Sequence, residues 1–140
     1  MKCGTDIIEI SRIKESIEKY GETFINRIYS PREIEYCEKK GQVKYQHYAA
    51  RFASKEAVAK MLGTGFNGSF EWKDIEVINE GENKKITIHQ EGNKEAIIKV
   101  DSTGRIISYE NNHLQSCGYG FLRENKSLQE LSLPELQICR

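Results

Sequence analysis

The sequence predicts an α+β fold in a single domain, because helix-like and strand-like patterns occupy different parts of the chain. Residues 11–62 show helical spacing of apolar side chains, whereas residues after Gly68 alternate between apolar and polar as strands do. An N-terminal strand and several helices, one of them long and central, should therefore pack on an antiparallel sheet. A length of 140 residues suits one domain with a modest core.

The chain opens with a predicted strand, residues 2–10, that contains three isoleucines. Its alternation puts Asp6 and Ile8 on one face, and we expect the strand to join the later sheet. Ser11 follows as a possible N-cap of a helix that ends at Gly21, because a serine side chain accepts from free N–H groups and glycine ends helices well.

Two shorter helical segments come next. A helical turn is expected at residues 24–28. After it, Ser30 as N-cap, Pro31 at the first helical position and Glu33 two residues later form a capping box, which is a strong start signal. This helix should run to about Lys40.

The longest predicted helix spans residues 43–62. Its last fourteen residues contain no Gly or Pro, and alanine recurs among them five times. Glu56 and Lys60 lie one turn apart on a face of small alanine side chains, which a ligand could approach closely. Gly63 should end the helix in the left-handed conformation, and Gly65 leaves a loop whose N–H groups could approach a phosphate.

The second half of the sequence is predicted to form strands, followed by a polar C-terminal segment. Residues 93–100 are expected to form a short helix, and an apolar segment ends at residues 120–122. Residues 123–140 are polar with spaced leucines, so we expect a domain at 1–122 and an extension at 123–140 that is docked or mobile. The strands are expected at residues 70–78, 85–89 and 105–109.

Composition excludes several classes of function. Lys plus Arg and Asp plus Glu number 21 each, so no global charge attracts nucleic acid or an anionic membrane. The four cysteines form no close pair, which argues against zinc and against a disulfide framework. No apolar run approaches the roughly 20 residues of a membrane span, and no signal-peptide core is visible. We expect a cytoplasmic protein.

Two carboxylates suggest a metal site. Asp6 on the first strand and Glu56 on the long helix could converge on one hard cation, and Mg²⁺ is commonly held by one or two carboxylates, with water and substrate phosphates completing its shell. Together with Lys60 and the glycine loop, they are what a diphosphate substrate would need. Taken singly, Glu56 and Lys60 could be a common surface pair, and Asp6 could simply cap a turn.

Four segments together resemble the holo-acyl-carrier-protein synthases, the small bacterial 4′-phosphopantetheinyl transferases. The resemblance implies the fold of that family and a Mg²⁺-dependent transfer of the phosphopantetheine arm of coenzyme A to a serine of acyl carrier protein. It further implies release of adenosine 3′,5′-bisphosphate, a role in fatty acid biosynthesis, and a homotrimer with sites between protomers. The segments are GTDIIEISRI (4–13), FINRIYSPREI (24–34), RFASKEAVAKMLGTG (51–65) and WKDIEV (72–77).

The resemblance also implies roles for single residues. Asp6 and Glu56 would bind Mg²⁺, and Lys60 would contact the phosphate under attack. His113 aligns with a family histidine near coenzyme A, although a lone histidine beside an Asn-Asn turn is also typical of a surface loop. The other residues implied to hold coenzyme A are Arg51, Lys55, Gly63, Thr64 and Gly65. The residues implied to meet the acidic carrier protein are Arg12, Lys14, Lys19 and Arg27.

Two other interpretations remain open. A non-catalytic relative would bind the carrier protein or coenzyme A without transfer; the combined presence of Asp6, Glu56 and Lys60 favours the enzyme, because a binding module needs no metal acids. Another Mg²⁺-dependent enzyme of phosphate-containing nucleotides is a third reading, against which the basic helix around Arg12 argues.

Overall fold

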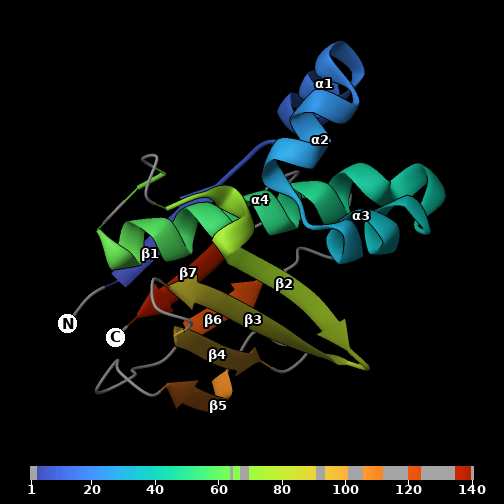
Figure 1. The fold of residues 1–140 in the computed structure, drawn as a ribbon. Helices are drawn as coiled ribbons and strands as arrows, with labels where there is room; N and C mark the ends of the chain where they lie inside the picture. Colours follow the sequence, from blue (N-terminus) through green and yellow to red (C-terminus); the bar gives the residue numbers. More distant parts are fainter. Residues whose placement is uncertain are drawn as a thin grey trace.

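Helix α4 (Lys44–Leu62) is the central element of the molecule. The computed structural model describes residues 3–63, 65–66, 70–90, 94–100, 106–111, 120–123 and 135–139. Within these residues, α4 contacts strands of two separate antiparallel sheets, with the other helices gathered near its N-terminal end (Figure 1). The predicted α+β class is confirmed.

The helices begin and end close to the predicted positions. α3 starts with the predicted capping box, in which Ser30 Oγ accepts from Glu33 N–H and the Glu33 carboxylate accepts from Ser30 N–H at 2.8 Å. The predicted N-cap Ser11 is wrong by two residues, because α1 begins at Ile10 with Glu9 at the N-cap. The remaining helices are α1 (Ile10–Tyr20), α2 (Glu22–Ile28), α3 (Pro31–Glu38) and the 3₁₀ helices η1 (Gly41–Val43) and η2 (Trp72–Asp74).

Four strands form an antiparallel meander in which each strand pairs with the next. The short helix predicted at 93–100 is wrong, since these residues form a strand between two others. Lys, Glu and Ala favour a helix only weakly, and pairing with strands on both sides overrides that preference. The strands are β2 (Ile75–Glu80), β3 (Asn83–Gln90), β4 (Lys94–Val100) and β5 (Ile106–Asn111).

The opening strand lies in a different sheet from the one predicted. β1 (Cys3–Ile7) pairs antiparallel with β7 (Glu135–Cys139), which also pairs with β6 (Gly120–Arg123). In this register Asp6 lies opposite Leu136. Five residues of the predicted C-terminal extension thus form the middle strand of the second sheet, a long-range pairing that local patterns cannot reveal.

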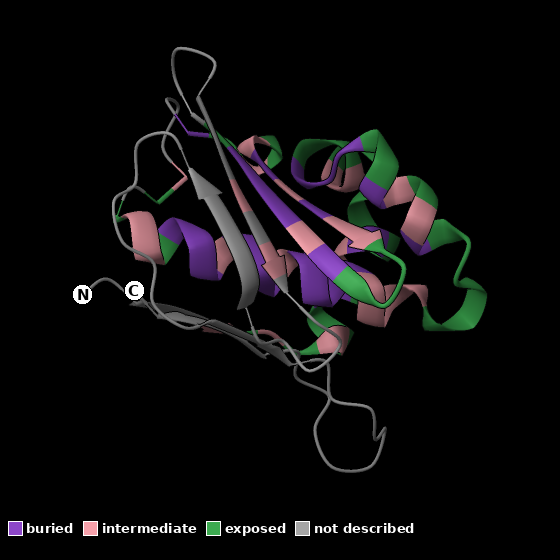
Figure 2. Ribbon diagram, turned by 90° about the horizontal axis from the view of Figure 1, so that it is seen from below, coloured by how far each residue is buried: buried purple, intermediate pink, exposed green. Residues whose placement is uncertain are grey.

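Buried residues follow α4 and the strands beside it (Figure 2). The C-terminal half of α4 packs on β2 and β3 through a cluster that includes Ala57, Val58, Ile75 and Ile88. Its N-terminal half packs on the other helices through a second cluster. That cluster includes Ile13, Ile17, Ile28, Tyr29, Cys37, Tyr48 and Ala49. None of the described helices is both long enough and apolar enough to cross a membrane.

Candidate active site

Asp6 and Lys60 meet between the first strand and the central helix. Lys60 Nζ donates to Asp6 Oδ1 at 2.8 Å. The Asp6 side chain is 15% exposed and that of Lys60 is 52% exposed, so the pair lies at the surface but is reachable mainly from the lysine side. The ion pair keeps the pKa of Lys60 above its ordinary value, chiefly through the hydrogen bond to Asp6.

Glu56 belongs to the same group of charges. Burial raises the pKa of its carboxyl, the charge on Asp6 raises it further, and the ammonium of Lys60 opposes both effects. We call Asp6, Glu56 and Lys60 the carboxylate site. Burial and a second carboxylate nearby both destabilise the charged form of a carboxyl. A cation bound beside the two carboxylates would stabilise their charged forms.

The donor set of the carboxylate site fits Mg²⁺. Two carboxylates with room for water and phosphate oxygens are a usual protein contribution to this ion. Among the described residues no group of three or more His, Cys, Asp or Glu side chains gathers as a metal cluster. Two carboxylates would leave the other positions around such an ion to water and to phosphate oxygens.

The alanines on the Glu56 face of α4 belong to the core. Ala49, Ala53 and Ala57 were expected to form a face open to ligand, but all three are buried. Ala57 packs in the cluster with β2 and β3, and Ala49 packs in the cluster with the other helices. These alanines therefore do not line a ligand site.

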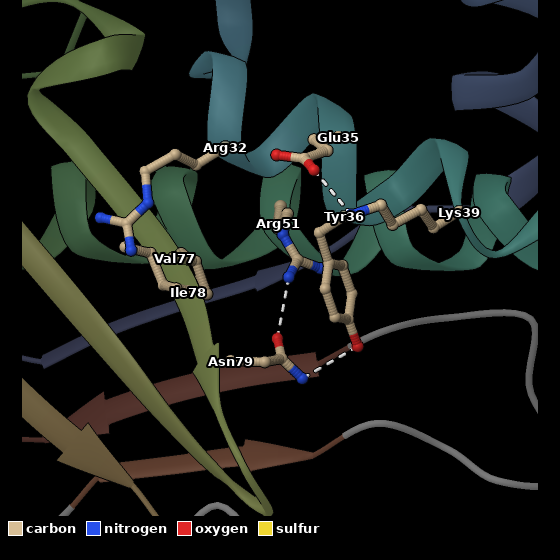
Figure 3. A pocket seen from close by; sticks show the side chains of 8 residues that line it. All are labelled: Arg32, Glu35, Tyr36, Lys39, Arg51, Val77, Ile78 and Asn79. Atoms are coloured by element: carbon tan, nitrogen blue, oxygen red, sulfur yellow. Dashed lines mark hydrogen bonds and ion pairs between the residues drawn. The ribbon is translucent and has the colours of Figure 1, made fainter.

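Arg51 is buried beside a second, separate pocket. This pocket of about 220 Å³ lies between α3, α4 and β2, and its lining includes Arg32, Lys39, Tyr36 and Asn79 (Figure 3). Arg51 donates from Nη2 to Asn79 Oδ1 at 2.8 Å, and Asn79 in turn donates to the Tyr36 hydroxyl at 2.9 Å. The guanidinium also lies 4.2 Å from the centre of the Tyr36 ring.

Among the residues that the structure describes, the charge of Arg51 has only neutral hydrogen-bond partners. The residue is 2% exposed, its Nη1 donates to the His47 carbonyl, and its Nε has no partner within the same residues. Burying a cation without a carboxylate partner is unfavourable. The other two cations on the pocket already have carboxylate partners, since Lys39 lies 2.6 Å from Glu35, which also lines the pocket, and Arg32 lies 3.7 Å from Glu76. Arg51 is therefore the pocket cation that an added anion would benefit most.

Lys55 is a core residue and does not face a ligand. Its side chain and that of Glu33 have no exposed area, and Nζ lies 2.7 Å from Glu33 Oε2. The same ammonium donates to the carbonyls of Ile28 at 2.7 Å and Trp72 at 3.2 Å, so its three N–H groups all have acceptors. The coenzyme A contact predicted for Lys55 is therefore corrected to an internal role.

The glycine loop and the histidine were also predicted to hold coenzyme A. Gly63 ends α4 with φ 74° and ψ 9°, as predicted, and its N–H donates to the carbonyls of Ala59 and Lys60. Gly65 has φ 58° and is exposed. Thr64 and His113 lie outside the described residues.

Comparison with known proteins decides the family. Residues 2–103 match the model of the 4′-phosphopantetheinyl transferase superfamily, and this match covers more than half of the chain. The chain belongs to this superfamily. The holo-acyl-carrier-protein synthase of Solibacter usitatus is 53% identical over 76 residues, which are 54% of this chain and 60% of that protein. The corresponding protein of Halothermothrix orenii is 43% identical over 110 residues, 76% of this chain and 86% of that one.

Solved structures show the same fold. A holo-acyl-carrier-protein synthase from Bacillus anthracis, in complex with CoA (3′,5′-ADP), aligns with a TM-score of 0.58 at 27% identity over 98% of this chain and 92% of that chain. The Helicobacter pylori protein, in complex with coenzyme A, aligns with a TM-score of 0.60 at 20% identity over 97% and 96% of the two chains. The chain spans about 60% of the length of the first curated relatives it matches.

The basic surface predicted on α1 and α2 is mixed in charge. Arg12, Lys14, Lys19 and Arg27 are all exposed. Lys14 lies 3.8 Å from Glu18 as an exposed pair on α1. The cations therefore alternate with carboxylates and do not form a purely positive patch.

Two features of the structure have no local sequence signal. Asn79 and Tyr36, which complete the Arg51 pocket, come from β2 and α3 and carry no local motif. Glu33 was assigned only a capping role, yet its carboxylate also pairs with Lys55 and accepts from Val77 N–H at 2.9 Å. Both depend on contacts between residues more than 20 positions apart.

Proposed function

We propose that this protein transfers the 4′-phosphopantetheine arm of coenzyme A to a serine of acyl carrier protein, with Mg²⁺, releasing adenosine 3′,5′-bisphosphate. The observation that carries the proposal is the carboxylate site, in which Asp6, Glu56 and Lys60 come together from β1 and α4. The relatives named as holo-acyl-carrier-protein synthases support it.

Asp6 and Glu56 would hold the Mg²⁺ through their carboxylate oxygens. When bound, the ion offsets the negative charge that builds up on the diphosphate as it is attacked. The raised pKa of Glu56 supports this assignment, because a cation would favour the charged form of both carboxyls. No other described acid shares this group of charges in the contacts that surround Lys60.

Lys60 would contact the phosphoryl group under attack. Its side chain is half exposed, so the ammonium is accessible to a phosphate while Asp6 keeps it oriented. An ammonium fixed beside the reacting phosphate stabilises the transition state, in a reaction where positioning and electrostatics do most of the work. The proton of the attacking serine would leave to water or to a nearby carboxylate.

The Arg51 pocket would hold an anionic part of coenzyme A. A phosphate there would give the buried guanidinium the charged partner that it lacks among the described residues. The loop at Gly63 and Gly65, Thr64 and His113 would complete the coenzyme site.

Arg51 and Glu56 are five residues apart on α4 and thus point about 140° away from each other. The two residues therefore lie on different faces of one helix, and we further propose a homotrimer, as the resemblance implies, in which neighbouring protomers would complete one site. The acidic carrier protein would dock on Arg12, Lys14, Lys19 and Arg27, where its charge offsets theirs. We further propose that the enzyme works in the cytoplasm in fatty acid biosynthesis.

Intact-mass spectrometry tests the proposal. Apo-acyl carrier protein incubated with this protein, coenzyme A and Mg²⁺ should gain roughly 340 Da, the mass of one phosphopantetheine arm. Glu56→Gln should abolish the gain, and Glu22→Gln, an exposed carboxylate on α2, should leave it unchanged. No gain from the folded wild-type protein would point to a relative that binds without transfer, and transfer by Glu56→Gln at the parent rate would overturn the metal assignment.

A further inference from the structure

Lys60 covers the carboxylate that the proposed metal would need. Its Nζ donates to Asp6 Oδ1 at 2.8 Å, and the two side chains form an ion pair. The Asp6 side chain is only 15% exposed, so an ion from solvent meets a carboxylate that is mostly covered. The protein therefore holds one of its own cations at the carboxylate that the proposed function assigns to Mg²⁺.

The ammonium of Lys60 offsets only part of the negative charge around it. Glu56 lies one helical turn before Lys60 on α4, and the charges of both Asp6 and Lys60 act on its carboxyl. Two carboxylates and one ammonium leave a net charge of about −1 at neutral pH, whereas a divalent cation offsets both carboxylates. Exchange of the ammonium for Mg²⁺ thus improves the charge balance of Asp6 and Glu56.

Of the two paired side chains, the lysine is the one placed to move. Asp6 lies on β1, which pairs with β7 and packs on α4. Lys60 lies in the last turn of α4, and its side chain is 52% exposed on a flexible four-carbon stem. An ammonium and a divalent ion repel each other strongly when both lie against one carboxylate. The lysine side chain is therefore expected to leave when the carboxylate binds a metal.

We propose that Lys60 is an internal counter-ion of the metal site: it pairs with Asp6 in the metal-free protein and is released when Asp6 and Glu56 bind Mg²⁺. This inference rests on the proposed function. Exposed ion pairs are weak, so the release is readily reversible. The released ammonium then becomes available for the phosphate of coenzyme A. The site therefore assembles in a fixed order, with the metal before the coenzyme contact of Lys60.

This exchange couples the binding of the metal to the binding of coenzyme A through Lys60. In the metal-free protein, a phosphate that approaches Lys60 has to compete with Asp6 for the ammonium. Once Asp6 binds the metal, this competition ends. Because coupling between two ligands is reciprocal, coenzyme A should in turn strengthen the binding of Mg²⁺. Part of this coupling should disappear in Lys60→Met, where no ammonium is released.

Calorimetric titration of the metal-free protein with Mg²⁺, without coenzyme A and at fixed ionic strength, tests the competition. Lys60→Met should bind Mg²⁺ about fivefold more tightly than wild type, because it loses the competing pair. Lys60→Arg should bind Mg²⁺ more weakly than wild type, since a guanidinium can hold a carboxylate through two hydrogen bonds. Charge repulsion alone would make wild type and Lys60→Arg equal. That result, or no gain in Lys60→Met, would overturn the proposal.

Two further variants serve as controls for the titration. Lys44→Met removes another lysine of α4 that pairs with a carboxylate, that of Glu38 at 3.0 Å, and lies about 24 Å from Lys60 along the helix. It should leave the Mg²⁺ affinity unchanged. Asp6→Asn removes the proposed ligand and gives the background uptake by other carboxylates. An affinity gain in Lys44→Met as large as that in Lys60→Met would show a general charge effect and contradict the exchange.

Nuclear magnetic resonance observes the release directly. An ammonium held in a hydrogen bond exchanges its protons slowly with water, so the ¹H–¹⁵N signal of Lys60 should be visible at low temperature in the metal-free protein. The absence of this signal in Lys60→Met assigns it, and the signal should disappear in proportion to the bound Mg²⁺. A Lys60 signal that persists unchanged at saturating Mg²⁺ would overturn the proposal, because the pair with Asp6 would then survive metal binding.

Mass spectrometry of the carrier protein separates this inference from the proposed function. If the wild-type protein adds phosphopantetheine but keeps the pair of Lys60 and Asp6 in saturating Mg²⁺, the proposed function stands and only the exchange is wrong. If Mg²⁺ releases Lys60 but no transfer occurs, the proposed function is wrong, and so is the step in which the released ammonium meets coenzyme A.

Discussion

Lys60 Nζ lies 2.8 Å from Asp6 Oδ1, which joins the middle helix to the first strand across 54 positions of sequence. The contact links β1 to α4 one helical turn away from Glu56. The opening strand is thus held to α4 by a residue that also belongs to the proposed carboxylate site.

Lys60→Met is expected to separate these two roles. Removing a cation that stabilises a transition state typically costs about 100-fold or more in kcat. The loss of a half-exposed ion pair should lower the free energy of unfolding by at most about 1 kcal/mol. Kinetic assays and urea unfolding measure the two effects; Lys99→Met, which removes a half-exposed pair with Glu80, should alter neither. An unchanged kcat in Lys60→Met would argue against the phosphate contact.

Lys55→Met should mainly destabilise the fold. The substitution leaves the Glu33 carboxylate buried without its partner, and breaking one side of a buried pair costs about 3–5 kcal/mol. Urea unfolding followed by circular dichroism gives the value. A cost as small as that of Lys99→Met would mean that water enters the site and replaces the ammonium.

Gly63→Ala tests the end of α4. With φ at 74°, a Cβ is strained even though no atom lies within 4 Å of its position. The left-handed conformation costs a residue with a side chain about 1–2 kcal/mol, so the free energy of unfolding should fall by that amount. Gly63→Asn should cost less, because asparagine tolerates this conformation, and equal values for the two variants would exclude backbone strain as the cause.

The buried thiol of Cys37 should make the protein less stable at alkaline pH. Burial raises the pKa of its thiol from 9.0 to about 12. Above pH 9 the unfolded chain releases this proton while the folded chain retains it, so stability should fall between pH 9 and 12, by about 1.4 kcal/mol per pH unit at most. Urea unfolding of wild type and Cys37→Ala at several pH values measures the difference.

Burial also raises the pKa values of two tyrosines, which could contribute to the same pH dependence of stability. The comparison with Cys37→Ala separates the contribution of the thiol from theirs. The variant has a cavity, but the loss of unfolding free energy that the cavity causes should not vary with pH. The difference in unfolding free energy between wild type and Cys37→Ala should therefore become smaller as the pH rises. A constant gap from pH 8 to pH 11 would contradict the raised pKa.

The sequence by itself determined the elements whose signals are local. The capping box at Ser30 and Glu33, the long alanine-rich helix and its end at Gly63 depend on residues within a few positions of one another. The α+β class and the family resemblance followed from the order of such segments. The pairing of Asp6 with the α4 site was expected from two separate segments, because each carried a recognisable pattern.

Only the tertiary structure decided which charges are internal and which sheet holds the first strand. Lys55 precedes Glu56 in sequence but lies on a different face of the helix. Its ammonium is in the core, where it donates to Glu33, Ile28 and Trp72. Residues 94–100 become a strand because β3 and β5 pair with them, and β1 pairs with β7 from the far end of the chain. Such partners are distant in sequence, and burial and long-range hydrogen bonds are properties of the whole fold.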